Sequence, residues 1–89
     1  MIAEERVERL HALARQAAAE GETDRAREYV RLARRVAERN RLSLPRTFVR
    51  FACDDCDRYR RPGADARVRL ADGHVVIACD CGRIDRHPY

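Results

Sequence analysis

Four cysteines arranged as two close pairs constrain the fold of this chain more than any other feature of its sequence. The pairs are Cys53 with Cys56 and Cys79 with Cys81, in the pattern C-x2-C-x22-C-x-C. Structural zinc is typically bound by four side chains in a tetrahedron, often as two close pairs from separate turns. The pattern therefore predicts one structural Zn²⁺ bound by all four cysteines.

Two other uses of the cysteines are the alternatives. A disulfide framework requires an oxidising compartment, and a redox-active C-x-x-C motif requires a βαβ context that the sequence lacks.

The second pair is one residue shorter than the usual zinc knuckle, so we expect a backbone N–H···S bond to be missing there. Alternate residues of a strand point to the same side, so both sulfurs still reach one ion. His74 and Asp80 are weaker candidates for substitute ligands.

The size of the chain makes such a metal site important. Its 89 residues and mass of 10.3 kDa suffice for one small domain, and such domains usually need disulfides, a metal or a partner for stability. No apolar run approaches the ~18 residues that cross a bilayer, and the first residues lack the pattern of a secretory signal. We therefore expect no membrane partner, a cytoplasmic location and reduced cysteines available to a metal.

Residues 1–41 are predicted to form an antiparallel helical hairpin. Apolar residues recur with the helical period on both sides of Gly21, which can end the first helix. A short connection makes the two helices antiparallel. Their facing residues are mostly alanine, so the hairpin alone buries little apolar surface. We expect part of that surface to dock a partner protein, and the candidate docking residues are Leu10, Leu13, Tyr29, Leu32 and Val36.

The rest of the chain is predicted to be a linker and a ribbon. Residues 42–52 are expected to form the linker and a first strand, because apolar residues alternate loosely over 47–52. Residues 53–89 are expected to form a zinc ribbon with a basic C-terminal tail. The predicted fold class is therefore α+β: a small zinc-binding protein with an N-terminal two-helix hairpin and a C-terminal β zinc ribbon.

A β-hairpin is predicted between the two cysteine pairs. Residues 66–70 alternate cleanly, which places Val68 and Leu70 inward and the arginines between them outward. The dipeptide Asp72-Gly73 is typical of a two-residue hairpin turn, and residues 74–78 are expected to return as the partner strand. This hairpin would bring the second cysteine pair back beside the first.

All 19 basic residues are arginine, and the formal net charge is +4 with a pI near 9.2. A GC-rich genome explains the lack of lysine, but the arginines remain suited to phosphates and base stacking. Bound thiolates lower the net charge, so RNA binding must come from local patches. The aspartates beside the cysteines are expected to be solvated. The candidate RNA-binding residues are Arg46, Arg50, Arg58, Tyr59, Arg60, Arg61, Arg67, Arg69, Arg83 and Arg86.

The sequence offers no constellation for catalysis. It contains no paired-carboxylate cleft and no phosphate-binding glycine loop, and four thiolates leave no open metal position for hydrolysis. His11 lies at the edge of the first helical stripe, where a solvated side chain is expected. We therefore predict no catalytic residues in this chain.

Four segments resemble a known family. They are residues 26–35 followed by Leu44-Pro45-Arg46, residues 62–69, and the ending over residues 81–89. Their order and spacing are similar to the zinc-ribbon protein subunit of archaeal ribonuclease P, the Rpr-type subunit. The similarity covers nearly the whole chain and departs from the family at the C-x-C pair.

The resemblance implies two N-terminal helices, a linker and a zinc ribbon, in an accessory subunit of an enzyme that removes the 5′ leader from precursor tRNA. In that family the RNA carries catalysis together with magnesium ions. The implied partners are ribonuclease P RNA, a second protein subunit with an Sm-like barrel that docks on the helices, and precursor tRNA as substrate of the complex. The alternatives are a free-standing zinc-ribbon module of a transcription or translation complex and a zinc-stabilised protein adaptor.

Overall fold

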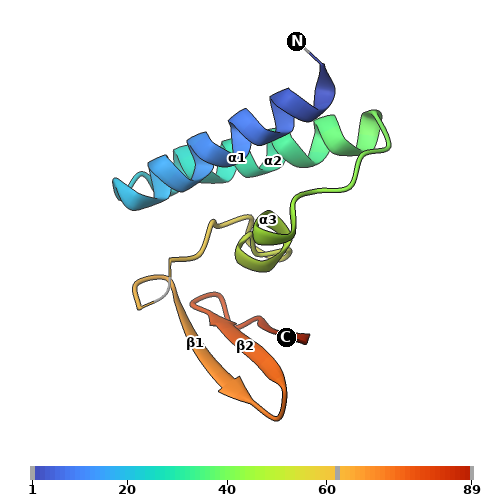
Figure 1. The fold of residues 1–89 in the computed structure, drawn as a ribbon. Helices are drawn as coiled ribbons and strands as arrows, with labels where there is room; N and C mark the ends of the chain where they lie inside the picture. The colour runs from blue at the N-terminus through green and yellow to red at the C-terminus, as the bar shows by residue number, and fades with distance from the viewer. Residues whose placement is uncertain (1, 62, 89) are drawn as a thin grey trace.

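The computed structural model describes residues 2–61 and 63–88, so predictions that fall on Met1, Pro62 and Tyr89 lie outside the described residues. The described residues form, in chain order, α1 (Ala3–Ala19), α2 (Thr23–Arg39), α3 (Arg46–Phe51), β1 (Ala66–Ala71), β2 (His74–Cys79) and β3 (Ile84–Pro88). Figure 1 shows the α1–α2 pair at one end, α3 and the loop after it in the middle, and the sheet at the other end. The predicted α+β class is confirmed.

The helical hairpin ends and reverses as its sequence predicts. Gly21 adopts a φ of +79°, which costs glycine little and other residues more. The backbone N–H groups of Gly21 and Glu22 donate to the carbonyls of Ala18 and Ala17, so the last turn of α1 is capped. No helix in the described residues is both long and apolar enough to cross a membrane.

One core joins the helical hairpin to the middle layer. Small side chains let α1 and α2 pack closely, and the aromatic residues that follow α2 fill the space beneath them. The buried cluster consists of Ala14, Ala17, Ala18, Ala26, Val30, Ala33, Phe48, Ala52 and Tyr59. The hairpin is therefore not an independent unit, because α3 and the loop after it complete its core.

The strand expected over residues 47–52 is wrong: Arg46–Phe51 is the helix α3. Helical spacing places Phe48, Phe51 and Ala52 on one face, against the core, while Val49 points to solvent. A strand would have put Phe48 and Phe51 on opposite faces. Packing of both aromatic rings against the same helical pair therefore decides the local structure.

The predicted β-hairpin is confirmed, and it belongs to an antiparallel sheet of order β1-β2-β3. Ala71 pairs with His74 across the turn, and Asp72 and Gly73 both have positive φ, as a type I′ turn requires. The expected basic tail is instead largely the edge strand β3, which pairs with β2. Its sequence has only one aliphatic residue, so backbone pairing, and not an apolar pattern, defines it. Pro88 is tolerated because it ends an edge strand.

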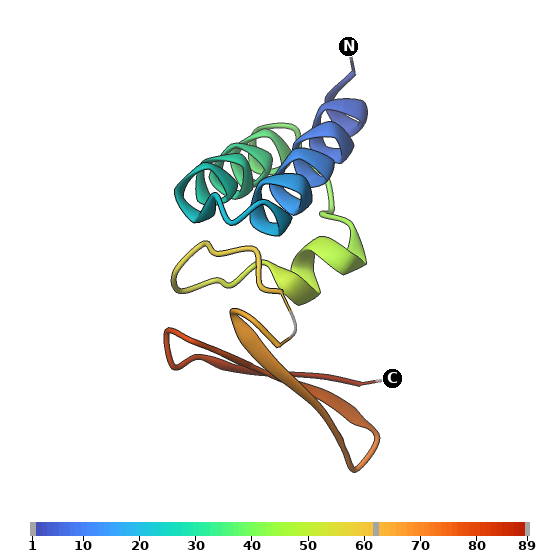
Figure 2. The same ribbon diagram turned by 90° about the vertical axis from the view of Figure 1, so that its left-hand side faces the viewer.

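The inward placement of Val68 and Leu70 is also wrong. These side chains are 41% and 70% exposed, although Ile77 on the same face is fully buried. Figure 2 shows that the β1–β2 hairpin extends away from the helices. Only the end of β1 near the cysteines, at Ala66, is buried. Strand alternation therefore predicted which residues share a face, but not how much of that face is buried.

Candidate metal centre

The first cysteine pair lies on a tight loop directly after α3. The N–H of Cys53 donates to the carbonyl of Arg58 at 2.9 Å, and the N–H of Asp57 donates to the carbonyl of Cys53 at 2.9 Å. Asp57 has a φ of 60°, a left-handed conformation that aspartate tolerates better than most residues. These bonds close residues 53–58 into a turn that directs Cys53 and Cys56 to the same side.

The second cysteine pair lies on the turn between β2 and β3. The N–H of Cys79 donates to the carbonyl of Arg83 at 2.8 Å, and the N–H of Gly82 donates to the carbonyl of Cys79 at 2.9 Å. These two bonds close residues 79–83 into a tight turn, which places Cys79 and Cys81 on the same loop.

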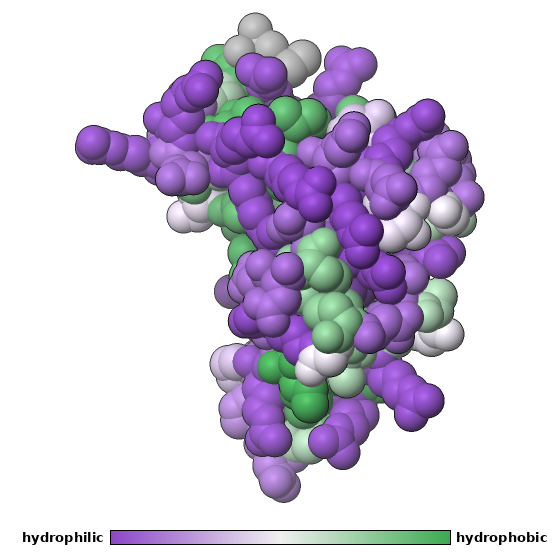
Figure 3. All heavy atoms as spheres, turned by 180° about the vertical axis from the view of Figure 1, so that it is seen from behind, coloured by the Kyte–Doolittle hydropathy of each residue, from purple (hydrophilic) through white to green (hydrophobic). Residues whose placement is uncertain are grey.

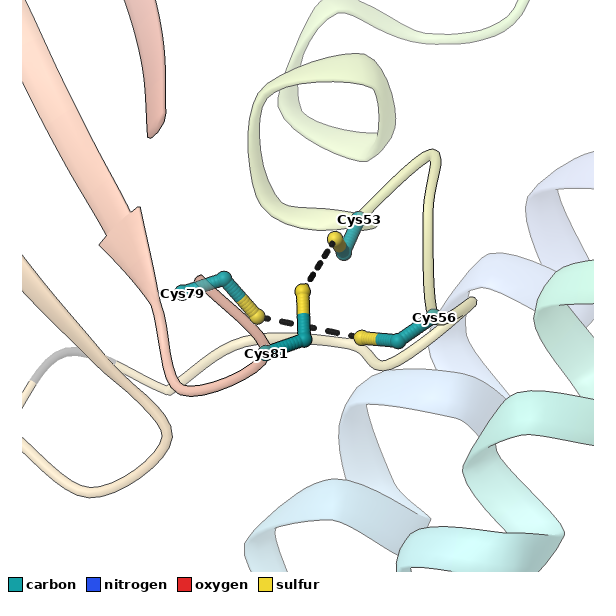
Figure 4. Close-up of side chains that lie close together, drawn as sticks. All are labelled: Cys53, Cys56, Cys79 and Cys81. Atoms are coloured by element: carbon teal, nitrogen blue, oxygen red, sulfur yellow. Dashed lines mark hydrogen bonds between the residues drawn. The ribbon is translucent and has the colours of Figure 1, made fainter. Parts of the chain in front are cut away.

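The structure brings all four sulfur atoms together. They lie within 4.8 Å of one another, and Figure 4 shows them converging from the two loops, with Cys53 facing Cys81 at 3.6 Å and Cys56 facing Cys79 at 3.8 Å. Four sulfurs bound at about 2.3 Å in a tetrahedron around one ion would be roughly 3.8 Å apart. The sulfurs are much too far apart for disulfide bonds, and their arrangement is compatible with a metal site.

The surroundings of the thiols affect how they release protons. Burial raises the pKa of Cys53 and raises that of Cys79 to about 12. The backbone N–H of Arg83 lowers the pKa of the exposed Cys81. A divalent ion that binds here must therefore displace protons from the buried thiols, and its apparent affinity must fall in acid.

Arginines of α2 bind the first cysteine loop to the helical hairpin. The side chain of Arg34 pairs with Asp57, donates to Asp54 at 3.0 Å and to the carbonyl of Cys53 at 3.2 Å. Arg31 donates to the other oxygen of Asp57 at 2.8 Å. The loop's position thus depends on α2, and sequence reasoning missed this role of both arginines.

The aspartates beside the cysteines were expected to be solvated, but they form ion pairs with arginines. Arg83, between the second pair and β3, contacts Asp55 at 3.0 Å, Asp54 at 3.6 Å and Asp85 at 2.8 Å. The hydrogen bonds that Arg83 donates to Asp85 and then to Asp55 raise the pKa of Arg83 above its usual value. Arg83 therefore links the two cysteine loops electrostatically, and its charge is largely compensated within the protein.

The densest group of candidate RNA-binding residues is also used inside the protein. Arg60 is only 1% exposed, and the ring of Tyr59 is buried with its hydroxyl 3.0 Å from Nε2 of His11. Arg58 pairs with Asp80 at 3.5 Å, and Arg61 pairs with Asp65 at 3.0 Å. The structure thus withdraws Arg60 and Tyr59 from the surface, where RNA contact would require them.

The other candidates are exposed at the surface, except Arg50, which is half-buried with its Nε enclosed. Among the described residues, no carboxylate lies within the 4.0 Å limit for an ion pair from their guanidinium nitrogens. They fall into two places, α3 and the face of the sheet turned away from the helices. These residues are Arg46, Arg50, Arg67, Arg69 and Arg86.

The candidate docking residues divide between the core and the surface. Leu10 and Tyr29 pack against the core cluster, whereas Leu32 is exposed and lines a shallow pocket of about 150 Å³ together with Val36. Leu13 lines another shallow pocket, of about 90 Å³, on the hairpin. Figure 3 shows one face of the molecule, on which hydrophilic residues dominate and hydrophobic residues form small separate patches.

His11 is a further residue whose place the sequence did not indicate. Its ring is buried, bonds to Tyr59 and meets the Phe48 ring edge-on at a centroid distance of 5.4 Å. Burial and then the charge of Arg15 lower the pKa of His11. A neutral histidine therefore connects α1 to α3 and to the residue after the first cysteine loop.

Fold and site together define a class: a small protein in which a helical hairpin, a middle layer of α3 and the first cysteine loop, and a three-stranded sheet are joined at a four-cysteine site. A family model described as the RNAse P Rpr2/Rpp21/SNM1 subunit domain matches residues 6–82. The chain belongs to this family of ribonuclease P subunits.

Individual relatives agree with the family match. Over 88 residues the chain is 66% identical to ribonuclease P protein component 4 of Halobacterium salinarum (strain ATCC 29341 / DSM 671 / R1), covering 99% of this chain and 95% of the relative. A chain in the cryo-EM structure of archaeal ribonuclease P with mature tRNA matches with a TM-score of 0.91 and 42% identity, over 98% of this chain and 76% of that one. The structure of Pfu Rpp21 matches with a TM-score of 0.67 and 36% identity, over 96% and 97%.

Proposed function

We propose that this chain is an accessory protein subunit of ribonuclease P that assists removal of the 5′ leader from precursor tRNA. The observation that carries the proposal is the match of nearly the whole fold, helices and ribbon together, to one chain of an archaeal ribonuclease P bound to tRNA. The chain contributes binding and folding, while the RNA of the complex and its magnesium ions carry the chemistry.

The ion at the four cysteines is a structural Zn²⁺. Support comes from the donor set, because four soft thiolates in a tetrahedral arrangement favour zinc. All four positions would be taken by sulfur, so the ion stabilises the ribbon and presents no site to water or substrate. A cytoplasmic location fits this role, because reducing conditions keep the thiolates unbridged.

Two surfaces serve the two kinds of partner. Ribonuclease P RNA meets the unpaired arginines of α3 and of the outer sheet face, which lie on the same half of the molecule as the cysteine site. A second protein subunit with an Sm-like barrel docks on the helical hairpin around Leu32 and Val36, with Leu13 at the far end. Precursor tRNA is the substrate of the assembled complex.

An omission experiment tests the subunit role. Ribonuclease P RNA and the other protein subunits are assembled at limiting magnesium with the zinc-loaded chain, without it, or with a Cys79→Ser/Cys81→Ser variant as the metal-deficient control. We expect precursor tRNA cleavage to drop without the chain and with the variant. Unchanged cleavage by an assembly shown to be competent would contradict the proposal and favour a free-standing zinc-ribbon module.

A further inference from the structure

The face of the sheet turned away from the helices has an unusual composition. Register and strand alternation place its central residues in two neighbouring rows across the three strands. One row is Arg67, Ala78 and Ile84, and the other is Arg69, Val76 and Arg86. We call these six residues the arginine face. Cys79 and Asp85, which contact Cys56 and Arg60, lie on the opposite face of the sheet. Figure 2 shows the helices on one side of the sheet, so no described helix covers the arginine face.

The arginine face contains a shallow pocket with an apolar floor. Its volume is about 260 Å³, and it is lined by Arg67, Arg69, Val76, Ala78 and Ile84. Val76 is only 3% exposed although no helix packs above it, whereas Ile84 at the edge is 62% exposed. Long arginine side chains can cover apolar surface with their methylene stems while their guanidinium groups stay in water. The pocket thus combines a flat hydrophobic floor with a cationic rim.

The positive charge of this face is not compensated from within the described residues. The strand residues that point to this side include no aspartate or glutamate. No described carboxylate lies within 4.0 Å of the guanidinium nitrogens of Arg67, Arg69 or Arg86. Arg58, Arg61 and other arginines near the cysteines, by contrast, do have such partners. The face therefore suits a ligand that is anionic on one side and flat and apolar on the other.

A nucleotide of unpaired RNA has that chemistry. We propose that the arginine face binds single-stranded RNA, with one base against Val76, Ala78 and Ile84 and the adjacent phosphates on the arginines. Guanidinium planes stack on unpaired bases as aromatic rings do, and a duplex cannot offer a base face to a shallow pocket. The pocket is slightly smaller than sites of roughly 300–1,000 Å³ for drug-sized ligands, which suits a single base. The proposal rests on the proposed function and names the form of RNA that this part of the subunit binds.

Matched variants separate the pocket from general charge. Arg67→Gln/Arg69→Gln removes two charges from the face and keeps most of the side-chain stems. The control Arg9→Gln/Arg39→Gln removes two exposed charges from α1 and α2 that, like those of the face, have no carboxylate partner among the described residues. The probe is a fluorescein-labelled twelve-nucleotide single-stranded RNA of mixed sequence, measured by anisotropy with the zinc-loaded full chain. We expect about tenfold weaker binding for the face variant and less than about twofold for the control.

Two further probes test whether a base is bound. The same RNA annealed to its complement, and the same RNA with abasic positions, should bind the native chain several-fold more weakly than the intact single strand. The face variant should bind the abasic RNA and the intact single strand with equal affinity, because its base-binding pocket is already weakened. Equal binding of all three RNAs, or an equal loss in face and control variants, would overturn the proposal in favour of a diffuse electrostatic contact.

Nuclear magnetic resonance locates the contact. Adding the single strand should shift the backbone amides of Val76, Ala78 and Ile84 more than those of α2. Shifts at these amides with the Sm-like barrel subunit, and none with RNA, would make the face a protein-docking surface and overturn the proposal. The omission experiment tests the subunit role independently. If cleavage depends on the chain but RNA does not shift these amides, this inference fails and the subunit role stands. If the amides respond to RNA but cleavage does not need the chain, the proposed function fails.

Discussion

Nη1 of Arg60 donates a 2.8 Å hydrogen bond to Oδ2 of Asp85, which joins the segment after the first cysteine loop to β3. The Arg60 side chain is fully buried, and its Nε also donates to the carbonyl of Phe51 at 3.1 Å. Burial alone would raise the pKa of Asp85, but hydrogen bonds from Arg83 and Arg60 hold it below its usual range. The pair thus connects α3, the first loop and the sheet.

Replacing Arg60 with alanine should therefore unfold or strongly destabilise the protein. Arg60→Ala removes a buried charge that bonds Asp85 and the carbonyls of Phe51 and Arg50, and although Asp85 keeps Arg83 as a partner, these acceptors lose their donor. Removing one member of a buried ion pair costs roughly 3–5 kcal/mol. Arg61→Ala is the matched control, because Arg61 is half-exposed and its pair with Asp65 should contribute no more than about 1 kcal/mol. Urea unfolding of the zinc-loaded proteins gives both values, and similar losses in the two variants would show that Arg60 is not a structural residue.

Arg60 was predicted to contact RNA but is buried, and it illustrates what the sequence could and could not predict. The spacing of the four cysteines and the Asp72-Gly73 turn are local signals, and both led to the correct ribbon. The arginines carry no local signal that separates internal from surface roles. Arg60 finds its acceptor 25 residues away at Asp85, and Arg34 finds Asp57 23 residues away, so their roles depend on the tertiary fold.

The wrong strand before the first cysteine has a similar cause. The apolar residues at 48, 49, 51 and 52 fit either a loosely alternating strand or a short helix, and so short a segment does not distinguish the two. The core of α1 and α2, with small alanines that leave space for both Phe48 and Phe51, decides in favour of the helix. His11 was missed for the same reason, because its partner Tyr59 is 48 residues away.

Removing the metal should unfold the sheet and loosen the layer above it. The ribbon has few buried apolar residues of its own, so metal binding supplies folding free energy. A strong chelator should collapse the dispersed amide signals of β1, β2 and β3 and reduce the far-UV helix signal less. Zinc, but not magnesium, should restore the spectrum. Cobalt should bind in place of zinc and give the absorption of a tetrahedral four-thiolate site, and an amide spectrum unchanged by the chelator would refute the structural role.

The stability of the protein should decrease in mild acid partly because of His11. The pKa of His11 is lowered in the folded protein, from an ordinary value of 6.5, by burial and then by Arg15. Between the two pKa values the unfolded chain binds more protons, so the free energy of unfolding rises with pH there. The contribution is full above about pH 6.5 and is lost as the pH falls below it.

His11→Gln isolates this contribution, because glutamine can still bond to the Tyr59 hydroxyl but does not titrate. The zinc thiolates and the carboxylates titrate in both proteins, so the difference between the two pH profiles reports His11 alone. We expect the two unfolding curves to converge in acid and separate towards neutral pH. Parallel profiles from pH 5 to 8 would mean that the His11 pKa is the same folded and unfolded.

The helical hairpin should bind the Sm-like barrel subunit through Leu32. This side chain is the exposed leucine of α2, and it adjoins Val36 in a shallow pocket bordered by Arg35 and Arg39. Leu32→Glu should weaken the complex by about thirtyfold if Leu32 lies at the centre of the interface. Its effect on the stability of the isolated chain should be small, because Leu32 is outside the core cluster.

Val49→Glu on α3 is the matched control, because Val49 is similarly exposed but lies on another element. Calorimetric titration of the zinc-loaded chain with the partner subunit measures both, and equal affinities for the two variants would move the docking surface away from this face of α2.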